Sequence, residues 1–130
     1  MTTSINTHYE RIGGEDGVKK LVDRFYDLMD TWDEVKELRE IHSPDLARAR
    51  STLFDFLSGW LGGPNLFVEK YGHPMLRKRH LHFPIDIKMR DQWLLCMYRA
   101  MEEEELEPDL QQALRQSFLK TADHMRNQPE

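Results

Sequence analysis

The feature that most constrains this chain is a stripe of apolar residues that recurs at helical spacing. Between residues 15 and 30, six positions follow the i, i+3, i+4, i+7 rule: Val18, Leu21, Val22, Phe25, Tyr26 and Met29. Residues at this spacing lie on one face of an α-helix. The pattern predicts a helix in this segment whose apolar face, including Tyr26, points inward.

The same spacing recurs in three later segments. One starts near Leu46 and runs to about residue 61, where Gly62-Gly63-Pro64 provides a stop because proline cannot continue the turn. Another covers about 87–104, and a last helix begins at Pro108. No stretch alternates apolar and polar residues as a half-buried strand does, so the predicted fold class is all-α.

The connection between the second and third long helices carries two shorter features. Residues 62–73 are expected to be loop, with 65–67 as a local packing point. A short helical segment is expected at 74–80, because Pro74 suits a first helical turn. Leu76 and His80 then share the inner face of that segment.

Size and charge set the broad class. A chain of 130 residues fits one domain, in which residues 1–8 form an N-terminal extension and 127–130 a C-terminal tail. The net charge of −5, with cations concentrated at residues 77–79, argues against a nucleic-acid partner. Cys96 has no partner for an internal disulfide, and neither a signal peptide nor a membrane-spanning stretch is visible, so a cytoplasmic location is expected.

Residues 71–85 are the segment most informative about function. His80 follows three consecutive cations and precedes an aromatic residue and a proline. An imidazole on a short, stiff element can offer a nitrogen to a metal, while the cations can neutralise carboxylates. Haem has both partners, an iron and two propionates. Arg79 is the first candidate for a propionate and Arg77 the second, although such a charge run can also simply solvate a turn.

Less specific interpretations apply to the same residues. His73 and His82 suggest a zinc site with His80, but their spacing matches no usual ligand pattern. Tyr26 and Trp93 can equally be core aromatics whose polar tips bond to the backbone.

The chain resembles a truncated haemoglobin of the group II type over roughly residues 9–98. The motifs that carry this resemblance are Tyr9-x-x-Ile12-Gly13-Gly14, Arg24-Phe25-Tyr26, Leu38-Arg39, Asp45-Leu46, Phe56-Leu57, Gly62-Gly63-Pro64, Tyr71-Gly72-His73-Pro74, Leu76-Arg77, Arg79-His80, Phe83-Pro84-Ile85, Trp93 and Cys96-Met97. The resemblance implies a two-over-two helical sandwich around one haem b, with His80 as the proximal iron ligand.

On the opposite haem face, the resemblance implies that Tyr26 and Trp93 donate hydrogen bonds to the bound ligand. His42 stands where the family commonly has tyrosine or phenylalanine, and it would add an ionisable group to the distal site. Ala49 and Leu53 would face the ligand without hydrogen-bonding to it.

Several apolar side chains either line the haem edge or belong to the plain core. These are Phe56, Trp60, Phe67, Leu76, Phe83 and Met97.

The sequence leaves three functional classes open. The first is a haem protein that binds dioxygen, nitric oxide or carbon monoxide, although tight retention suits oxygen transport poorly. The second is a redox enzyme, dioxygenase-like or peroxidase-like, that consumes nitric oxide or peroxide and needs an external electron-donor reductase. The third is a haem-free interaction module, and the chain can be a monomer or a homodimer in any of them.

Overall fold

A computed structural model describes residues 7–75, 78, 80 and 85–127 of the chain. In chain order its elements are α1 (His8–Ile12), α2 (Gly14–Thr31), the 3-10 helix η1 (Asp33–Val35), α3 (Lys36–Glu40), α4 (Ala47–Trp60), α5 (Leu66–Tyr71), α7 (Ile87–Glu103) and α8 (Pro108–His124). These residues contain no strand, which confirms the all-α prediction.

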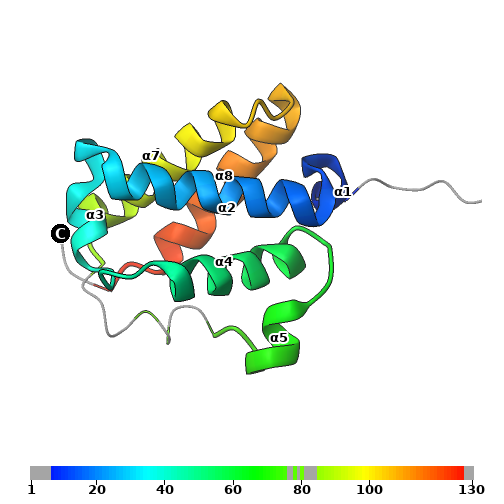
Figure 1. Cartoon of the computed structure of the whole chain (residues 1–130), viewed down its shortest axis with the longest axis horizontal. Helices are drawn as coiled ribbons and strands as arrows, with labels where there is room; N and C mark the ends of the chain where they lie inside the picture. The colour runs from blue at the N-terminus through cyan, green and yellow to red at the C-terminus, as the bar shows by residue number, and fades with distance from the viewer. Residues whose placement is uncertain (1–6, 76–77, 79, 81–84, 128–130) are drawn as a thin grey trace, which may run out of the picture.

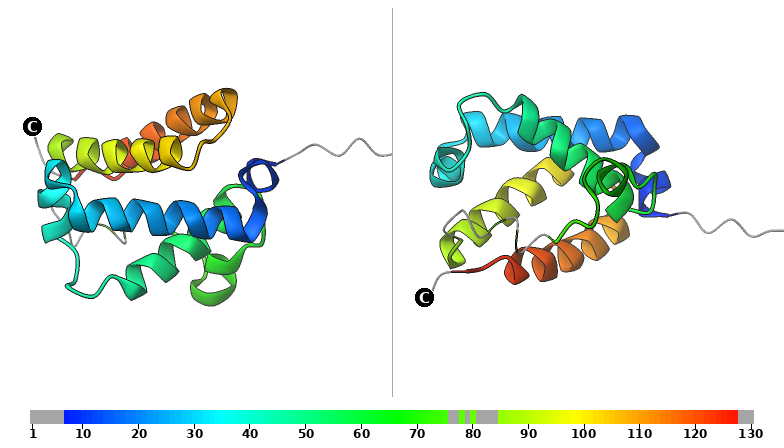
Figure 2. Two further views of the ribbon diagram at one scale, coloured as in Figure 1. Left: turned by 45° about the horizontal axis from the view of Figure 1, so that its top comes forward. Right: turned by 90° about the horizontal axis from the view of Figure 1, so that it is seen from below.

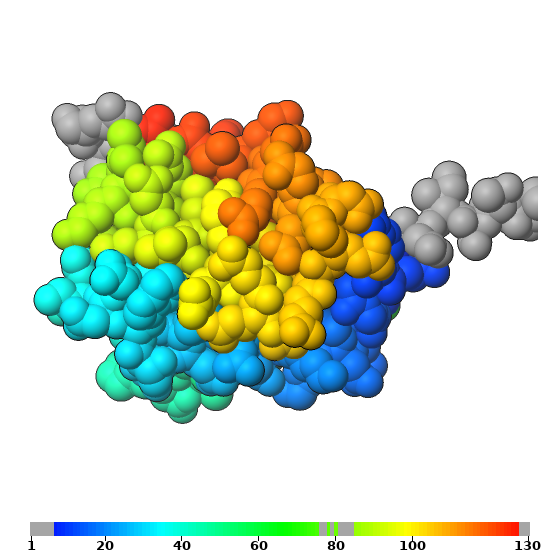
Figure 3. All heavy atoms as spheres, turned by 90° about the horizontal axis from the view of Figure 1, so that it is seen from above, coloured from blue at the N-terminus to red at the C-terminus, as the bar shows by residue number. Residues whose placement is uncertain are grey.

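The four long helices form two pairs (Figure 1). Helix α2 packs against both α4 and α7, and α7 packs against α8. Seen from below, α2 and α4 lie on one side of the molecule and α7 and α8 on the other (Figure 2). From above, the side chains of α2, α7 and α8 meet on one continuous face (Figure 3). This arrangement is the predicted two-over-two sandwich.

The apolar face of α2 forms the centre of the core, as its spacing predicts. All six stripe residues are buried, and the most exposed of them, Tyr26, is only 5% exposed. Met97 of α7 and Leu114 of α8 are fully buried in the same cluster. Within the part of the chain that the structure describes, no helix has both the length and the apolar character needed to cross a bilayer.

The N-terminal extension is shorter than predicted, because His8 already belongs to helix α1. Thr7 caps this helix: its hydroxyl accepts a hydrogen bond from the Glu10 amide at 3.1 Å, and the Glu10 carboxylate accepts one from the Thr7 amide at 3.3 Å. This reciprocal capping box satisfies amides that a helix start otherwise leaves unpaired. Gly13 ends the helix with a positive φ of 110°.

The motif Gly62-Gly63-Pro64 stops α4 and also receives α1. The Tyr9 amide donates a hydrogen bond to the Leu61 carbonyl oxygen at 2.9 Å. A side chain at Gly63 would collide with the Tyr9 ring, so only glycine allows this close approach. Two motifs that lie about fifty residues apart in the sequence therefore act as one contact.

The prediction of loop throughout residues 62–73 is wrong, because helix α5 lies within that range. Its Phe67 is 5% exposed and meets the Phe56 ring edge-on at a centroid distance of 6.1 Å. Lys70 pairs with the buried carboxylate of Asp55 at 2.9 Å. A six-residue helix has little stability of its own, so these contacts with α4 stabilise α5.

Two other segments differ from the sequence prediction. Helices η1 and α3 were not expected, and they lead the chain from α2 towards His42. In the segment 74–80, Pro74 and Met75 are not helical, whereas Lys78 and His80 are. The predicted starts of the other helices hold: Asp86 caps α7 through the Met89 amide at 2.8 Å, and α8 begins at Pro108.

Candidate functional site

The structure brings the predicted distal side chains together, although they come from three separate segments. The rings of Tyr26 on α2 and His42 after α3 meet edge-on, with their centroids 6.1 Å apart. Phe25 links Tyr26 to Trp93 on α7, with centroid distances of 4.9 Å and 5.3 Å. The Cys96 thiol donates to the Phe25 carbonyl oxygen at 3.2 Å, which ties α7 to α2 beside this group.

Tyr26 carries a polar atom that no described residue satisfies. Its hydroxyl makes no hydrogen bond with any residue that the structure describes, although the residue is buried. Burial raises the pKa of the phenol, so the O–H stays protonated near neutral pH. Because no described residue accepts from it, this O–H is available as a donor to a bound ligand. The Trp93 indole N–H is likewise unpaired within the described part of the chain.

Arg50 is a residue of this site that sequence reasoning missed. Its guanidinium carbon lies 5.8 Å from the centre of the Tyr26 ring. The same group pairs with Asp23 at 3.1 Å and with Asp27 at 2.8 Å. Asp23 and Asp27 are four residues apart on α2, next to Tyr26, and this spacing was the available signal. Arg50 thus joins α4 to α2 along one side of the tyrosine.

His42 is oriented by its own helix turn. Its Nδ1 lies 2.8 Å from the Leu38 carbonyl oxygen, and because a carbonyl only accepts, Nδ1 carries the proton. Burial lowers the pKa of His42, the hydrogen bond to the Leu38 carbonyl opposes this shift, and the nearby Arg39 charge adds to the lowering. The neutral imidazole therefore presents an acceptor nitrogen at Nε2, not the donor that a polar distal residue suggests.

The C-terminal end of the chain holds the segment that carries His80. The Asn127 side-chain amide donates to the His80 carbonyl oxygen at 3.1 Å. The Asn127 side-chain oxygen accepts a hydrogen bond from the Ile85 backbone N–H at 2.9 Å. The Asn127 backbone N–H donates to the Ile85 carbonyl oxygen, also at 2.9 Å. Asn127 was predicted to lie in the terminal tail, yet it contacts both flanks of the segment. His80 itself is half-buried.

Four predicted site residues, Leu76, Arg77, Arg79 and Phe83, lie outside the described residues.

Helix α4 supplies an apolar surface beside these groups. Ala49, Leu53 and Phe56 are spaced i, i+4, i+7, so they share one face of the helix. All three are half-buried and pack against the core. Phe67 joins Phe56 from α5, whereas Met97 lies entirely within the core.

These features fit a haem. An apolar helix face, a tyrosine hydroxyl that pairs with no described residue and an imidazole on a separate segment match what a planar iron cofactor needs. Among the described residues, no group of three histidine, cysteine, aspartate or glutamate side chains is placed to hold a metal ion. The four helices and this site define a helical haem-binding fold of the globin type.

Comparison with known proteins gives the particular family. The Bacterial-like globin profile matches residues 7–127, and the chain belongs to this family. It is 42% identical over 130 residues, or 100% of its length and 96% of the relative's, to the group 2 truncated hemoglobin YjbI of Bacillus subtilis. The group II 2-on-2 hemoglobin of Agrobacterium tumefaciens superposes with a TM-score of 0.94 at 45% identity, covering 99% of this chain and 100% of that one.

A third similar protein is described as a truncated oxygen-avid haemoglobin. This structure from Bacillus subtilis superposes with a TM-score of 0.84 at 40% identity, covering 94% of this chain and 100% of that one. The recognition of a group II truncated haemoglobin from sequence is therefore confirmed. Membership of the globin family implies a haem cofactor and binding of oxygen at that haem.

Proposed function

We propose that the chain holds one haem b through His80 and retains dioxygen with hydrogen bonds from Tyr26 and Trp93. Haem, when bound, supplies the iron that binds the diatomic ligand. The observation that carries the proposal is the Tyr26 hydroxyl, which belongs to a residue only 5% exposed and has no hydrogen-bond partner within the described part of the chain. The name of the oxygen-avid relative agrees with such a polar distal site.

Each residue has a separate task in this proposal. Tyr26 and Trp93 direct an O–H and an N–H at the ligand, which carries partial negative charge when bound to ferrous iron. Ala49 and Leu53 exclude water from the ligand without competing for those donors. Asn127 acts as a positioning residue, because it fixes the backbone on which His80 stands. The Nε2 of neutral His42 can only accept a hydrogen bond. His42 can therefore donate a hydrogen bond to the ligand only after Nε2 is protonated.

Slow ligand release follows from two donors and favours redox use of the bound ligand over oxygen transport. Hydrogen bonds to charged groups contribute about 1.5–3 kcal/mol each, and about 1.4 kcal/mol changes a rate tenfold. An oxygen carrier must release its oxygen, whereas a protein that consumes nitric oxide can keep the oxygen bound until nitric oxide arrives. Rapid consumption of nitric oxide by the oxygenated protein with an added reductant would support this role, and a stable oxygen complex without turnover would support binding alone.

The visible spectrum of the purified protein tests the ligand assignment. After expression with added haemin, the wild type should show the strong near-ultraviolet haem band and a five-coordinate ferrous spectrum. His80→Gly should lose that ferrous spectrum, and added imidazole should restore it by occupying the vacated position. His73→Ala is the matched control, because His73 is an exposed histidine of the same segment. A His80→Gly protein with an unchanged ferrous spectrum would refute the assignment.

A further inference from the structure

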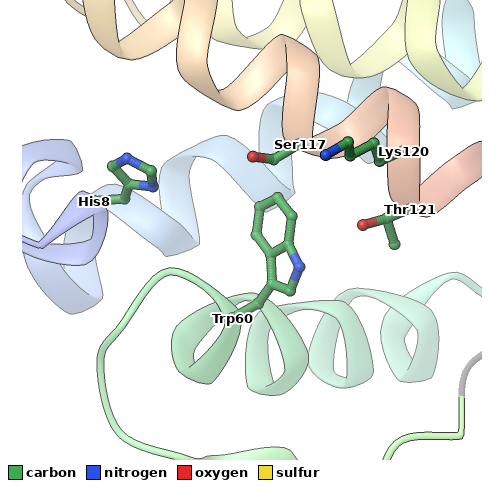
Figure 4. Close-up of a pocket in the computed structure, with 5 residues that line it drawn as sticks. All are labelled: His8, Trp60, Ser117, Lys120 and Thr121. Carbon is green, nitrogen blue, oxygen red and sulfur yellow. The ribbon is translucent and has the colours of Figure 1, made fainter.

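A surface pocket lies away from the distal residues, between α1, α4 and α8. It has a volume of about 370 Å³ and is lined by His8, Trp60, Ser117, Lys120 and Thr121 (Figure 4). Trp60 is the last residue of α4, about 16 Å along the helix axis from Ala49 at a rise of ~1.5 Å per residue. The pocket is therefore separate from the proposed ligand site.

Trp60 provides a firm flat wall of this pocket. Its indole projects from α4 towards α8, between His8 and the α8 side chains (Figure 4). Phe118 is 2% exposed and stacks on the indole with a centroid distance of 4.6 Å and an angle of 23°. One face of the indole is thus held by the core, while the ring still lines the pocket. An aromatic wall of this kind favours a planar ligand through offset stacking.

The remaining lining side chains are hydrogen-bonding groups with no assigned task. The side chains of His8, Ser117, Lys120 and Thr121 make no hydrogen bond or ion pair with any residue in the described ranges. Ser117, Lys120 and Thr121 are spaced i, i+3, i+4, so they share one face of α8.

The charge of this pocket is opposite to that of the whole molecule. The chain carries a net charge of −5, yet no carboxylate is among the five lining residues. Lys120 contributes a full positive charge and pairs with no acid in the described ranges, unlike Lys19, Lys70 and Lys88. One cation and no carboxylate in the lining favour an anionic group over a cationic one.

From this combination we infer that the pocket binds a small planar aromatic anion, with its ring against Trp60 and its carboxylate or phosphate at Lys120. The two hydroxyls and the His8 imidazole complete the polar contacts to the anionic group. A volume of about 370 Å³ is at the lower end of small-molecule sites, which suits one or two fused rings. Phe118 also contacts Trp93 at a centroid distance of 5.5 Å, so the site is one ring away from the proposed distal indole.

The test uses the full-length, haem-loaded protein in its ferrous carbon monoxide form, which is diamagnetic. Naphthoate is titrated by proton–nitrogen correlation NMR, with naphthalenemethanol as a probe of nearly the same shape and no charge. We expect naphthoate to shift the signals of Ser117, Lys120, Thr121 and the Trp60 indole. We expect the uncharged probe to bind about two- to fivefold more weakly, as an exposed ion pair contributes at most about 1 kcal/mol.

Two variants separate the contribution of the Lys120 charge from nonspecific binding of the probes to the protein surface. Lys120→Gln should weaken naphthoate about two- to fivefold and leave naphthalenemethanol unchanged, since only the first probe pairs with the ammonium group. Lys36→Gln, at an exposed lysine in the distant helix α3, is the matched control and should change neither affinity. Equal binding of the two probes, an equal loss of both in Lys120→Gln, shifts confined to other residues, or no binding at millimolar naphthoate would each overturn the inference.

Discussion

Replacing Tyr26 with phenylalanine should accelerate oxygen release without destabilising the fold. The substitution removes one oxygen atom and keeps the ring that packs edge-on against Phe25 at 4.9 Å. Because the Tyr26 hydroxyl has no partner within the described ranges, its loss breaks no hydrogen bond between those residues. The free energy of unfolding should therefore change by less than about 0.5 kcal/mol, as for substitutions that remove no interaction.

The effect on the ligand should be much larger. A hydrogen bond to a charged group is worth about 1.5–3 kcal/mol, which corresponds to about a ten- to 150-fold change in rate. Burial strengthens this bond, because water cannot replace the phenol easily once it is gone. We expect the oxygen dissociation rate, measured by stopped-flow replacement of oxygen with carbon monoxide, to rise within that range.

Tyr98→Phe is the matched control for this experiment. The Tyr98 hydroxyl donates to the Arg115 carbonyl oxygen at 3.0 Å, on the side of α7 that faces α8. This variant should lose about 0.5–1.5 kcal/mol of stability and keep the wild-type oxygen dissociation rate. The opposite outcomes of the two variants separate ligand binding from packing. An unchanged dissociation rate in Tyr26→Phe, with haem fully bound, would refute the role of the phenol.

Three further predictions concern neighbouring parts of the site. Trp93→Phe should also speed oxygen dissociation severalfold, because the indole N–H has no partner within the described residues, and an unaltered rate would show that it does not bond to the ligand. Lys70→Met leaves the buried Asp55 carboxylate without its partner and should lower the free energy of unfolding by about 1–3 kcal/mol in a denaturant titration; no loss would show that the pair does not hold α5 in place. The pKa of His42 lies below its usual value of 6.5, so the unfolded state binds the extra proton first and stability falls as the pH drops below about 6.5. The oxygen dissociation rate should then be flat between about pH 7 and 8 and change only under more acidic conditions, whereas a His42→Phe variant should lose the acidic change.

The sequence alone was sufficient for the long helices, because their signal is local. The spacing of Val18, Phe25 and Tyr26 predicts both a helix and its buried face, and burial of that face confirmed the prediction. Pro108 and the glycine motif at 62–64 marked boundaries for the same reason, since proline and glycine restrict or release the backbone wherever they stand.

The contacts that complete the site were decided only by the tertiary structure. Helix α5 exists because Phe67 and Lys70 reach α4, and neither residue shows helical periodicity over enough length to be recognised. Arg50 reaches Tyr26 from another helix, and Asn127 holds the backbone at His80 from 47 residues away. Periodicity reports which residues face inward, but it carries no information on which inward faces meet. That choice depends on how the helices pack, and the packing is a property of the whole chain.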